Sequence, residues 1–373
     1  MTSDPPAILV PLEAVQELRN DIVDLFQVSD TTLDDPEPGQ VRFRGQFLQD
    51  PADCFDELRE RFEGHGFTPR IEKQNDLPVL IAFPAVFRPS ESNPTINLLL
   101  LLATILSTLF VGATYNATTT NEVFMVWRGW PFSLSIMLIL GAHEMGHYFA
   151  AKYHKVPVSL PYFIPFPMPG SIGTFGAFIR LKAPVNNKRA LLDVGAAGPW
   201  AGIVFAIPIL FFGLATSEVL PLPADGSYMA EGNSILYALM KIIVFGRFLP
   251  ADGLDVHLNQ VAWAGWVGLL VTSINLIPVG QLDGGHVAYV LLGKWAKNLF
   301  WPVIIILGAL VVFTGTLTWI LWIALLLLLG RRYAVPLDDV TELDPRRRVI
   351  AILTLALFFL VFIPVPMQII TAQ

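Results

Sequence analysis

Cysteine and charged residues are scarce in this chain. Its 373 residues include one cysteine, Cys54, which excludes an intrachain disulfide and a cysteine-based zinc cluster. Charged residues make up only 15% of the sequence, against about 25% in average soluble domains. The first residues lack a basic region followed by an apolar stretch, so we expect no signal peptide. A net charge of −7 argues against a nucleic-acid-binding protein.

Apolar residues, 54% of the sequence, are grouped in long runs. A helix of about 20 such residues crosses the hydrocarbon core of a bilayer, so we predict an α-helical multi-pass membrane protein with about six to eight membrane segments. The expected spans are 96–115, 131–151, 190–216, 260–277, 300–313, 317–329 and 349–363, and 234–249 is a shorter segment that lies in the interface or enters only partway. The span over 190–216 begins with small residues, which allow close packing of membrane helices.

Residues 1–90 are predicted to form a small soluble α+β domain ahead of the first span. The expected elements are helices over 12–26 and 53–64, a polar linker over 30–40, and strands over 41–48, 67–73 and 77–83. The strands and the second helix then follow the order β-α-β-β. We further divide the chain into a membrane core over 91–290 and additional C-terminal spans over 291–373.

The span over 131–151 contains His143, Glu144 and His147, which spell H-E-x-x-H. Four residues apart on a helix, the two histidines point to one side and can share one metal ion. Glu144 follows the first histidine, where a carboxylate can take a proton from a metal-bound water. Such groups are costly inside a membrane unless they are paired or bind a metal, so we interpret them as functional.

A catalytic zinc ion commonly has three protein ligands, so a third residue is needed beside the two histidines. The candidates from the sequence are Asp283, in a helix-breaking turn after the span over 260–277, and Asp193, which follows Lys188 and Arg189 and could simply pair with them. We favour Asp283. Two imidazoles and a carboxylate suit zinc without fixing it over other divalent metals.

Residues 156–188 are predicted to be non-helical. Prolines remove the backbone donors that a helix needs over 156–169, and residues 170–181 suit a short hairpin because they mix glycines with aromatic and β-branched residues. This stretch is too apolar for an ordinary exposed loop. We therefore expect a membrane-associated β-hairpin that is buried in protein.

The topology follows from the distribution of basic residues, which are enriched in cytoplasmic loops. If the spans alternate, most basic residues fall on one side, namely Lys152, Lys155, Arg180, Lys182, Lys188, Arg189, Lys294, Lys297, Arg331, Arg332 and Arg346 to Arg348. Only Arg128, Lys241 and Arg247 fall on the other side. The N-terminal domain is therefore expected in the cytoplasm, with the cytoplasmic end of the metal-binding span level with Asp283.

His143-Glu-Met-Gly-His147 and Asn275-Leu-Ile-Pro-Val-Gly-Gln-Leu-Asp-Gly284 together resemble the two motifs of the site-2 protease family of intramembrane zinc metalloproteases. The resemblance covers roughly residues 132–286. It implies His143, His147 and Asp283 as ligands of one zinc ion and Glu144 as the catalytic acid/base. It also implies that the hairpin pairs with an unwound substrate as an added strand. The soluble N-terminal domain and the later spans resemble the chloroplast and cyanobacterial branch of the family.

Two further polar residues lie in the second motif. Asn275 either holds the substrate backbone or the tetrahedral oxyanion, or it makes a helix-packing hydrogen bond, since a buried amide needs partners in both cases. His286 either orients Asp283 or assists the oxyanion, or it is an interfacial histidine without a catalytic role.

The leading hypothesis is regulated intramembrane proteolysis, in which the chain cleaves transmembrane protein substrates near the cytoplasmic side of the bilayer. The expected location is a prokaryotic plasma membrane or a thylakoid-type membrane. One alternative is a catalytically silent relative that binds or assembles membrane proteins, although the intact Glu144 and the complete ligand set argue against it. A metal-ion transporter is a further alternative, but the sequence has no histidine-rich loop.

Overall fold

The computed structural model describes residues 10–371 except 36, 76, 89, 116, 118 and 224–226. The chain forms two compact units. The front unit comprises Met1–Ser90, Leu181–Leu191 and Val335–Asp344. The helical unit comprises Glu91–Arg180, Leu192–Ala334 and Pro345–Gln373.

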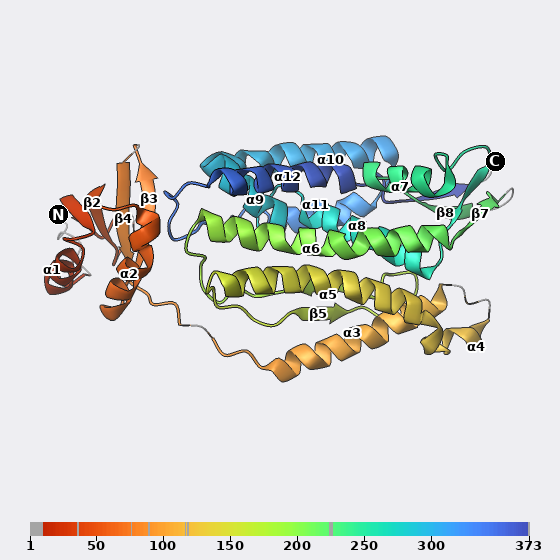
Figure 1. Ribbon diagram of the computed structural model, residues 1–373, viewed down its shortest axis with the longest axis horizontal. Coiled ribbons are helices and arrows are strands. Elements are labelled where there is room, and N and C mark those ends of the chain that lie inside the picture. The colour runs from red at the N-terminus through yellow and green to blue at the C-terminus, as the bar shows by residue number, and fades with distance from the viewer. Residues whose placement is uncertain are drawn as a thin grey trace, which may run out of the picture. The chain divides into compact units, whose positions relative to one another are not determined.

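The front unit is built on a four-stranded antiparallel sheet with the strand order β1-β2-β4-β3 (Figure 1). Its elements are α1 (Leu12–Asp21), β1 (Phe26–Leu33), β2 (Val41–Phe47), α2 (Pro51–Gly64), β3 (Thr68–Gln74) and β4 (Leu77–Phe83). Helix α2 begins at Pro51. The preceding residue, Asp50, caps it because its side chain accepts a hydrogen bond from the backbone N–H of Ala52. Apolar side chains of both helices and of the strands share one buried core, which includes Leu18, Leu58, Phe43 and Leu80.

The prediction of one helix over 12–26 followed by a linker over 30–40 is wrong. Helix α1 ends at Asp21, and β1 occupies Phe26–Leu33. Strand β1 pairs with β2 across a bulge, and the Phe26 ring packs edge-on against Phe47 at 4.8 Å. The apolar residues of both α1 and β1 face the same core. By chance, the first apolar residue of the strand continues the helical spacing of the apolar residues in α1, so the sequence suggested one longer helix. The element order is therefore α-β-β-α-β-β.

Two segments far along the sequence extend the edge of this sheet at β3. The Ile71 amide donates to Leu337 O at 2.7 Å, and the Asp339 amide donates back to Ile71 O at 3.0 Å. The Leu337 amide in turn donates to Val185 O at 3.0 Å. The β3 edge of the four-stranded sheet is thereby paired with segment 337–339, which pairs in turn with segment 185–187.

Asp338, which is fully buried, fixes the turn at the end of this pairing. Its carboxylate accepts hydrogen bonds from the backbone N–H groups of Val340 at 2.9 Å and Thr341 at 3.0 Å. Asp338→Ala would leave both donors without an acceptor, so we expect it to lower the free energy of unfolding of the front unit by about 2–4 kcal/mol. Hydrogen exchange of the Ile71 and Leu337 amides in the full chain measures this change.

Asp30→Ala is the matched control for this substitution, because Asp30 is exposed and its contact with Arg44, at 3.4 Å, lies at the surface of the same unit. An exposed ion pair contributes little, so exchange should be almost unchanged. Equal effects of the two substitutions would contradict a structural role for the Asp338 carboxylate.

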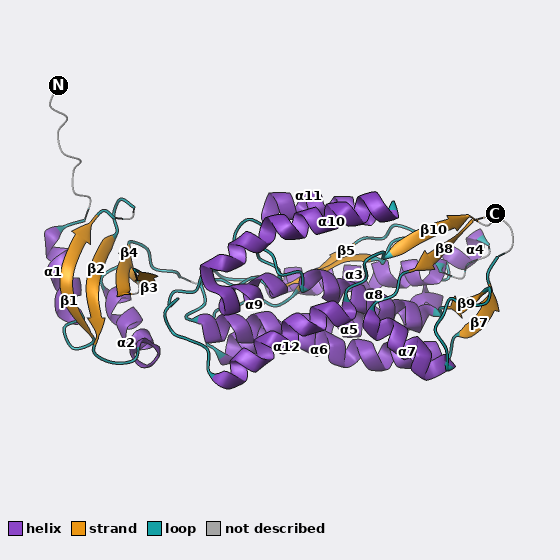
Figure 2. Ribbon diagram, turned by 90° about the horizontal axis from the view of Figure 1, so that it is seen from above, coloured by secondary structure: helices purple, strands orange, loops and turns teal. Residues whose placement is uncertain are grey.

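The helical unit is a bundle of long helices with three small two-stranded sheets among its described residues (Figures 1 and 2). Its α-helices are α3 (Pro94–Thr114), α4 (Thr120–Val123), α5 (Trp130–Tyr153), α6 (Lys188–Ala215, which begins in the front unit), α7 (Ile235–Phe245), α8 (Gln260–Asn275), α9 (Asp283–Leu292), α10 (Phe300–Thr314), α11 (Thr318–Leu329) and α12 (Pro345–Val361). Short 3-10 helices are η1 (Val126–Gly129) and η2 (Gly293–Leu299). The sheets pair β5 (Tyr162–Pro165) with β6 (Thr174–Phe178), β7 (Glu218–Pro221) with β9 (Leu254–His257), and β8 (Ser227–Glu231) with β10 (Met367–Thr371).

Three helical segments among the described residues are long and apolar enough to cross a bilayer: Pro94–Thr114, Lys188–Ala215 and Asp283–Thr314. Their outward faces are apolar; Leu106 and Phe313, for example, are 65% and 87% exposed. Apolar surface on this scale suits contact with lipid. The larger number of six to eight membrane segments stays a prediction.

Polar side chains of α3 hold the β-hairpin in place. Asn97 donates to Leu160 O at 2.9 Å and to Pro161 O at 3.0 Å, and the Ser107 hydroxyl donates to Gly173 O at 2.6 Å. These contacts satisfy non-helical backbone next to an apolar helix. The hairpin spans more residues than the one predicted within 170–181, because its first strand, β5, lies in the preceding proline-rich stretch. Prolines are tolerated there since each strand of a two-stranded sheet has an unpaired edge.

Candidate metal centre

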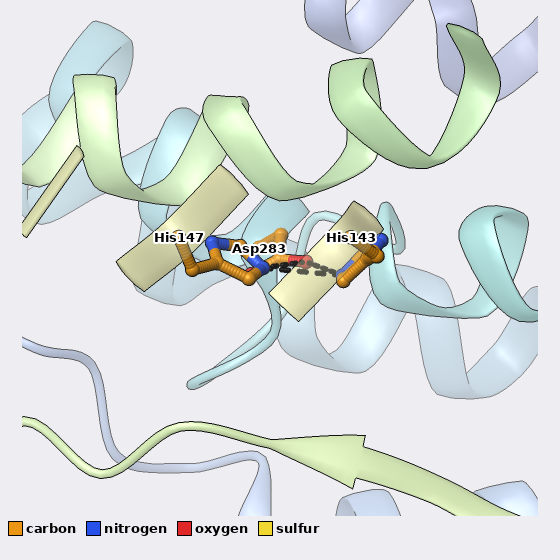
Figure 3. A group of neighbouring side chains, drawn as sticks. All are labelled: His143, His147 and Asp283. Carbon is orange, nitrogen blue, oxygen red and sulfur yellow. Dashed lines mark hydrogen bonds and ion pairs between the residues drawn. The ribbon is translucent and has the colours of Figure 1, made fainter. Parts of the chain in front are cut away.

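Helix α5 places two imidazoles on one face in the interior of the helical unit. His143 and His147 are 3% and 6% exposed, and their Nε2 atoms lie 3.1 Å apart (Figure 3). Neither ring can turn toward water at this depth. Two ring nitrogens that face each other so closely are stabilised by a cation between them.

Asp283, the first residue of α9, completes the group. Its Oδ2 atom lies 3.3 Å from Nε2 of His143 and 3.3 Å from Nε2 of His147 (Figure 3). Metal–ligand bonds of about 2.0–2.1 Å in a tetrahedral zinc site place the ligand atoms about 3.3 Å apart. The three donors therefore have both the chemistry and the spacing that zinc requires.

The turn between α8 and α9 brings Asp283 to the histidines. Gly280 has a positive φ of 64° in this turn, and a Cβ on Gly284 would lie 2.0 Å from Leu276 O. Only glycine fits this approach of α9 to the end of α8. The predicted turn at Asp283 is thus the first turn of a helix, where the positive end of the helix dipole stabilises a carboxylate.

The other ring nitrogen of His147, Nδ1, also has a partner. It lies 2.6 Å from the backbone oxygen of Val194 on α6. Since a carbonyl oxygen only accepts, Nδ1 carries the proton and Nε2 presents its lone pair toward His143 and Asp283. A second partner of this kind fixes the tautomer and the ring orientation of a metal ligand.

Glycines of α6 pack directly against the two histidines. A Cβ on Gly198 would lie 2.0 Å from His147 Nε2, and one on Gly202 would lie 3.2 Å from His143 Nδ1. Gly146 on α5 is equally close to α6, because its Cβ would lie 2.5 Å from Ala197 O. The small residues at the start of this span therefore bring the backbone of α6 against the two histidines.

The remaining predicted residues surround the three donors. Glu144 is 5% exposed, and the backbone of Ile179, which follows β6, lies next to it. The side-chain amide nitrogen of Asn275, at the end of α8, lies 3.3 Å from His143 Nε2. His286 lies one turn after Asp283, and its buried Nδ1 has no hydrogen-bond partner among the described residues.

Asp193, the other candidate for the third ligand, has different partners. Its carboxylate accepts from Arg347 of α12, with Nη2 at 2.7 Å, and lies 2.8 Å from Nε2 of His154. The sequence suggested pairing with Lys188 or Arg189 but gave no sign of Arg347. Nor could it reveal the Val194 carbonyl, because a backbone group has no sequence pattern of its own.

The metal centre falls within a recognised sequence family. The family model of peptidase family M50 matches residues 131–315, which include His143, Glu144, His147 and Asp283. This chain belongs to peptidase family M50, the site-2 protease family. The resemblance seen in the two motifs is confirmed, and the chain is an integral membrane protein of a zinc metalloprotease family.

Two curated relatives of the chain are plant proteins. The chain is 28% identical to "Probable zinc metalloprotease EGY2, chloroplastic" of Arabidopsis thaliana, over 96% of this chain and 66% of that protein. It is 31% identical to "Probable zinc metalloprotease EGY1, chloroplastic" of Arabidopsis thaliana, over 63% of this chain and 43% of that protein. The chain thus spans about two thirds of the length of the first relative and less than half of the second. No solved structure matches the chain at a significant level.

Proposed function

We propose that this site-2 protease cleaves transmembrane segments of membrane proteins, with zinc held by His143, His147 and Asp283 and with Glu144 as general acid/base. The observation that carries the proposal is the ligand geometry: three donor atoms lie 3.1–3.3 Å apart. Glu144 lies on α5 together with the two histidines. A bound zinc ion supplies Lewis acidity to water and to a peptide carbonyl.

The burial of Glu144 next to His143 supports a role in proton transfer. Glu144 follows His143 on α5 and is buried at 5% exposure, so its carboxylate can take a proton from the attacking water and return it to the leaving amine. Asn275, beside His143, can donate its side-chain N–H to the oxyanion that develops on the scissile carbonyl. Water attacks directly in this scheme, and no acyl-enzyme forms.

The hairpin gives an extended substrate a place to bind. Strand β6 pairs with β5 on one side only among the described residues, and Ile179, the residue after β6, lies next to Glu144. A substrate strand added to β6 would run toward the metal centre. The substrate helix must unwind first because helical hydrogen bonds shield its amides, so glycine or proline within the substrate span should favour cleavage.

The basic loops give the proposed orientation. The front unit and the metal centre lie toward the cytoplasmic side, or the corresponding side of a thylakoid-type membrane, because most basic residues flank the spans there. Cleavage then occurs near that face of the bilayer. The names of the relatives assign those proteins to chloroplasts, and a prokaryotic membrane is the other location that we propose for this chain.

The test is cleavage by the purified full chain of single-span substrates with and without a central glycine or proline, compared with Glu144→Gln. We expect Glu144→Gln to lower the rate by about 10²–10⁴-fold, the usual contribution of a general acid/base. Zinc content, measured in both proteins, should stay near one ion per chain, because Glu144 is not a ligand. Substrates without the helix-breaking residue should be cleaved more slowly.

Each contrary result points to a different error. If wild type and Glu144→Gln cleave equally, Glu144 is not the acid/base. If neither cleaves any substrate although both hold zinc, the chain is instead a binding or assembly factor that retains the metal. Equal cleavage of substrates with and without helix-breaking residues would contradict the proposal that the substrate helix must unwind.

A further inference from the structure

A cluster of three polar side chains joins three helices next to the candidate metal centre. Asp193 of α6 accepts from Arg347 of α12 through Nε at 3.0 Å and through Nη2 at 2.7 Å. Nε2 of His154, the residue directly after α5, lies 2.8 Å from the same carboxylate. The bidentate contact fixes the plane of the carboxylate as well as its position.

This cluster lies one residue away from the contact that orients a metal ligand. The backbone oxygen of Val194, which follows Asp193, receives the Nδ1 proton of His147 at 2.6 Å. His154 caps α5 seven residues after His147, a spacing of two helical turns that puts both residues on the same side of the helix. Consecutive residues of α6 therefore hold α5 at two points, one through the metal ligand and one through His154.

We propose that Asp193 is a positioning residue for zinc. Asp193 acts through Val194 and His147, and its own position is fixed by its contacts with Arg347 and His154. The inference rests on the proposed zinc site. Arg347 and His154 fix the start of α6, and this sets where the Val194 oxygen lies and so the direction of the His147 Nε2 lone pair. Metal–ligand distances tolerate changes of only about 0.2 Å, so a small shift of α6 lowers the affinity for zinc.

The proposal differs from a purely structural role in what it predicts. The side chains of Asp193 and Arg347 are 23% and 28% exposed, and ion pairs so close to solvent contribute little to stability. A partner that orients a metal ligand changes metal affinity by about 10–100-fold. Zinc affinity should therefore respond to the cluster far more strongly than thermal stability does.

The experiment measures zinc affinity by competition with a chelator, together with the absorption spectrum after Co²⁺ replaces zinc, in the purified full chain. We expect Asp193→Asn to weaken zinc binding about 10–100-fold and to alter the Co²⁺ spectrum. Arg347→Met should have a similar effect, and Arg347→Lys, which keeps the charge but loses the bidentate contact, should lie in between. The double substitution Asp193→Asn with Arg347→Met should cost less than the sum of the two single ones, because both remove the same contact.

Glu231→Gln is the matched control. Glu231 accepts from Tyr237 at 2.9 Å and contacts Lys241 at 3.3 Å, so it belongs to a more buried charged cluster of the same unit. It lines a cavity with Phe132, which lies eleven residues before His143 on α5, or roughly 16 Å along the helix. We expect Glu231→Gln to lower the melting temperature and to leave zinc affinity and the Co²⁺ spectrum unchanged.

Two outcomes would overturn the inference. If Asp193→Asn melts at a lower temperature but binds zinc and Co²⁺ like wild type, the cluster only holds the helices together. If wild type itself binds no zinc, the proposed function fails and the inference fails with it. Because the wild-type measurement comes first, the two failures are distinguishable.

Discussion

Asp283→Asn is expected to weaken zinc binding by more than about 100-fold, which exceeds the loss caused by removing a partner outside the ligand set. The substitution keeps the size of the side chain but removes the anionic oxygen that lies 3.3 Å from both imidazoles. An amide oxygen is a weaker ligand for zinc, and the two histidines alone provide too few protein ligands for a catalytic site. Cleavage should fall in proportion to the zinc that is lost, and added zinc should restore part of it.

Asp193→Asn and Asp255→Asn provide the comparison. Asp193 is the other aspartate that the sequence offered as a ligand, and Asp255 is a largely buried aspartate that contacts Lys241 at 3.6 Å. The expected order of zinc affinity is Asp255→Asn equal to wild type, then Asp193→Asn, then Asp283→Asn. If Asp193→Asn proved the weaker binder of the last two, Asp193 would be the third ligand and the geometry described here would not be that of the bound state.

The part of the metal centre that lies within one stretch of sequence could be predicted from the sequence. His143 and His147 are one helical turn apart, so their common direction follows from helix geometry alone. Asp283 is 136 residues after His147, and the residues by themselves left Asp193 open as an alternative. The structure separates the two candidates because it shows that Arg347, 154 residues away, binds the carboxylate of Asp193.

The front unit shows the same limit for the fold. Strands β2, β3 and β4 and helix α2 were predicted within a few residues, because each has a clear pattern of its own. Strand β1 was missed because its residues gain their stability from pairing with β2 and from the contact of Phe26 with Phe47. The segments around Val185 and Leu337 could not be assigned to this sheet, since a strand of three residues has no periodicity to detect.

Gly198→Ala should abolish zinc binding at low metal concentration, with a loss of at least about 100-fold in affinity. The added Cβ would lie 2.0 Å from Nε2 of His147, which is the atom proposed to bind zinc. The ring cannot turn away freely because Nδ1 is held by Val194 at 2.6 Å. Either the imidazole leaves its position or α6 moves away from α5, and both changes exceed the tolerance of about 0.2 Å in metal–ligand distances.

Two other glycines calibrate the result. Gly202→Ala brings a Cβ to 3.2 Å from Nδ1 of His143, a contact that a small shift relieves, so its effect on zinc affinity should be smaller. Gly308→Ala, on α10, has open space around the new methyl group, so zinc affinity should be unchanged. Affinity should therefore fall in the order Gly308→Ala, Gly202→Ala, Gly198→Ala. Normal zinc binding by Gly198→Ala would mean that α6 does not lie this close to His147 in the working enzyme, and the contact through Val194 would then lose its role as well.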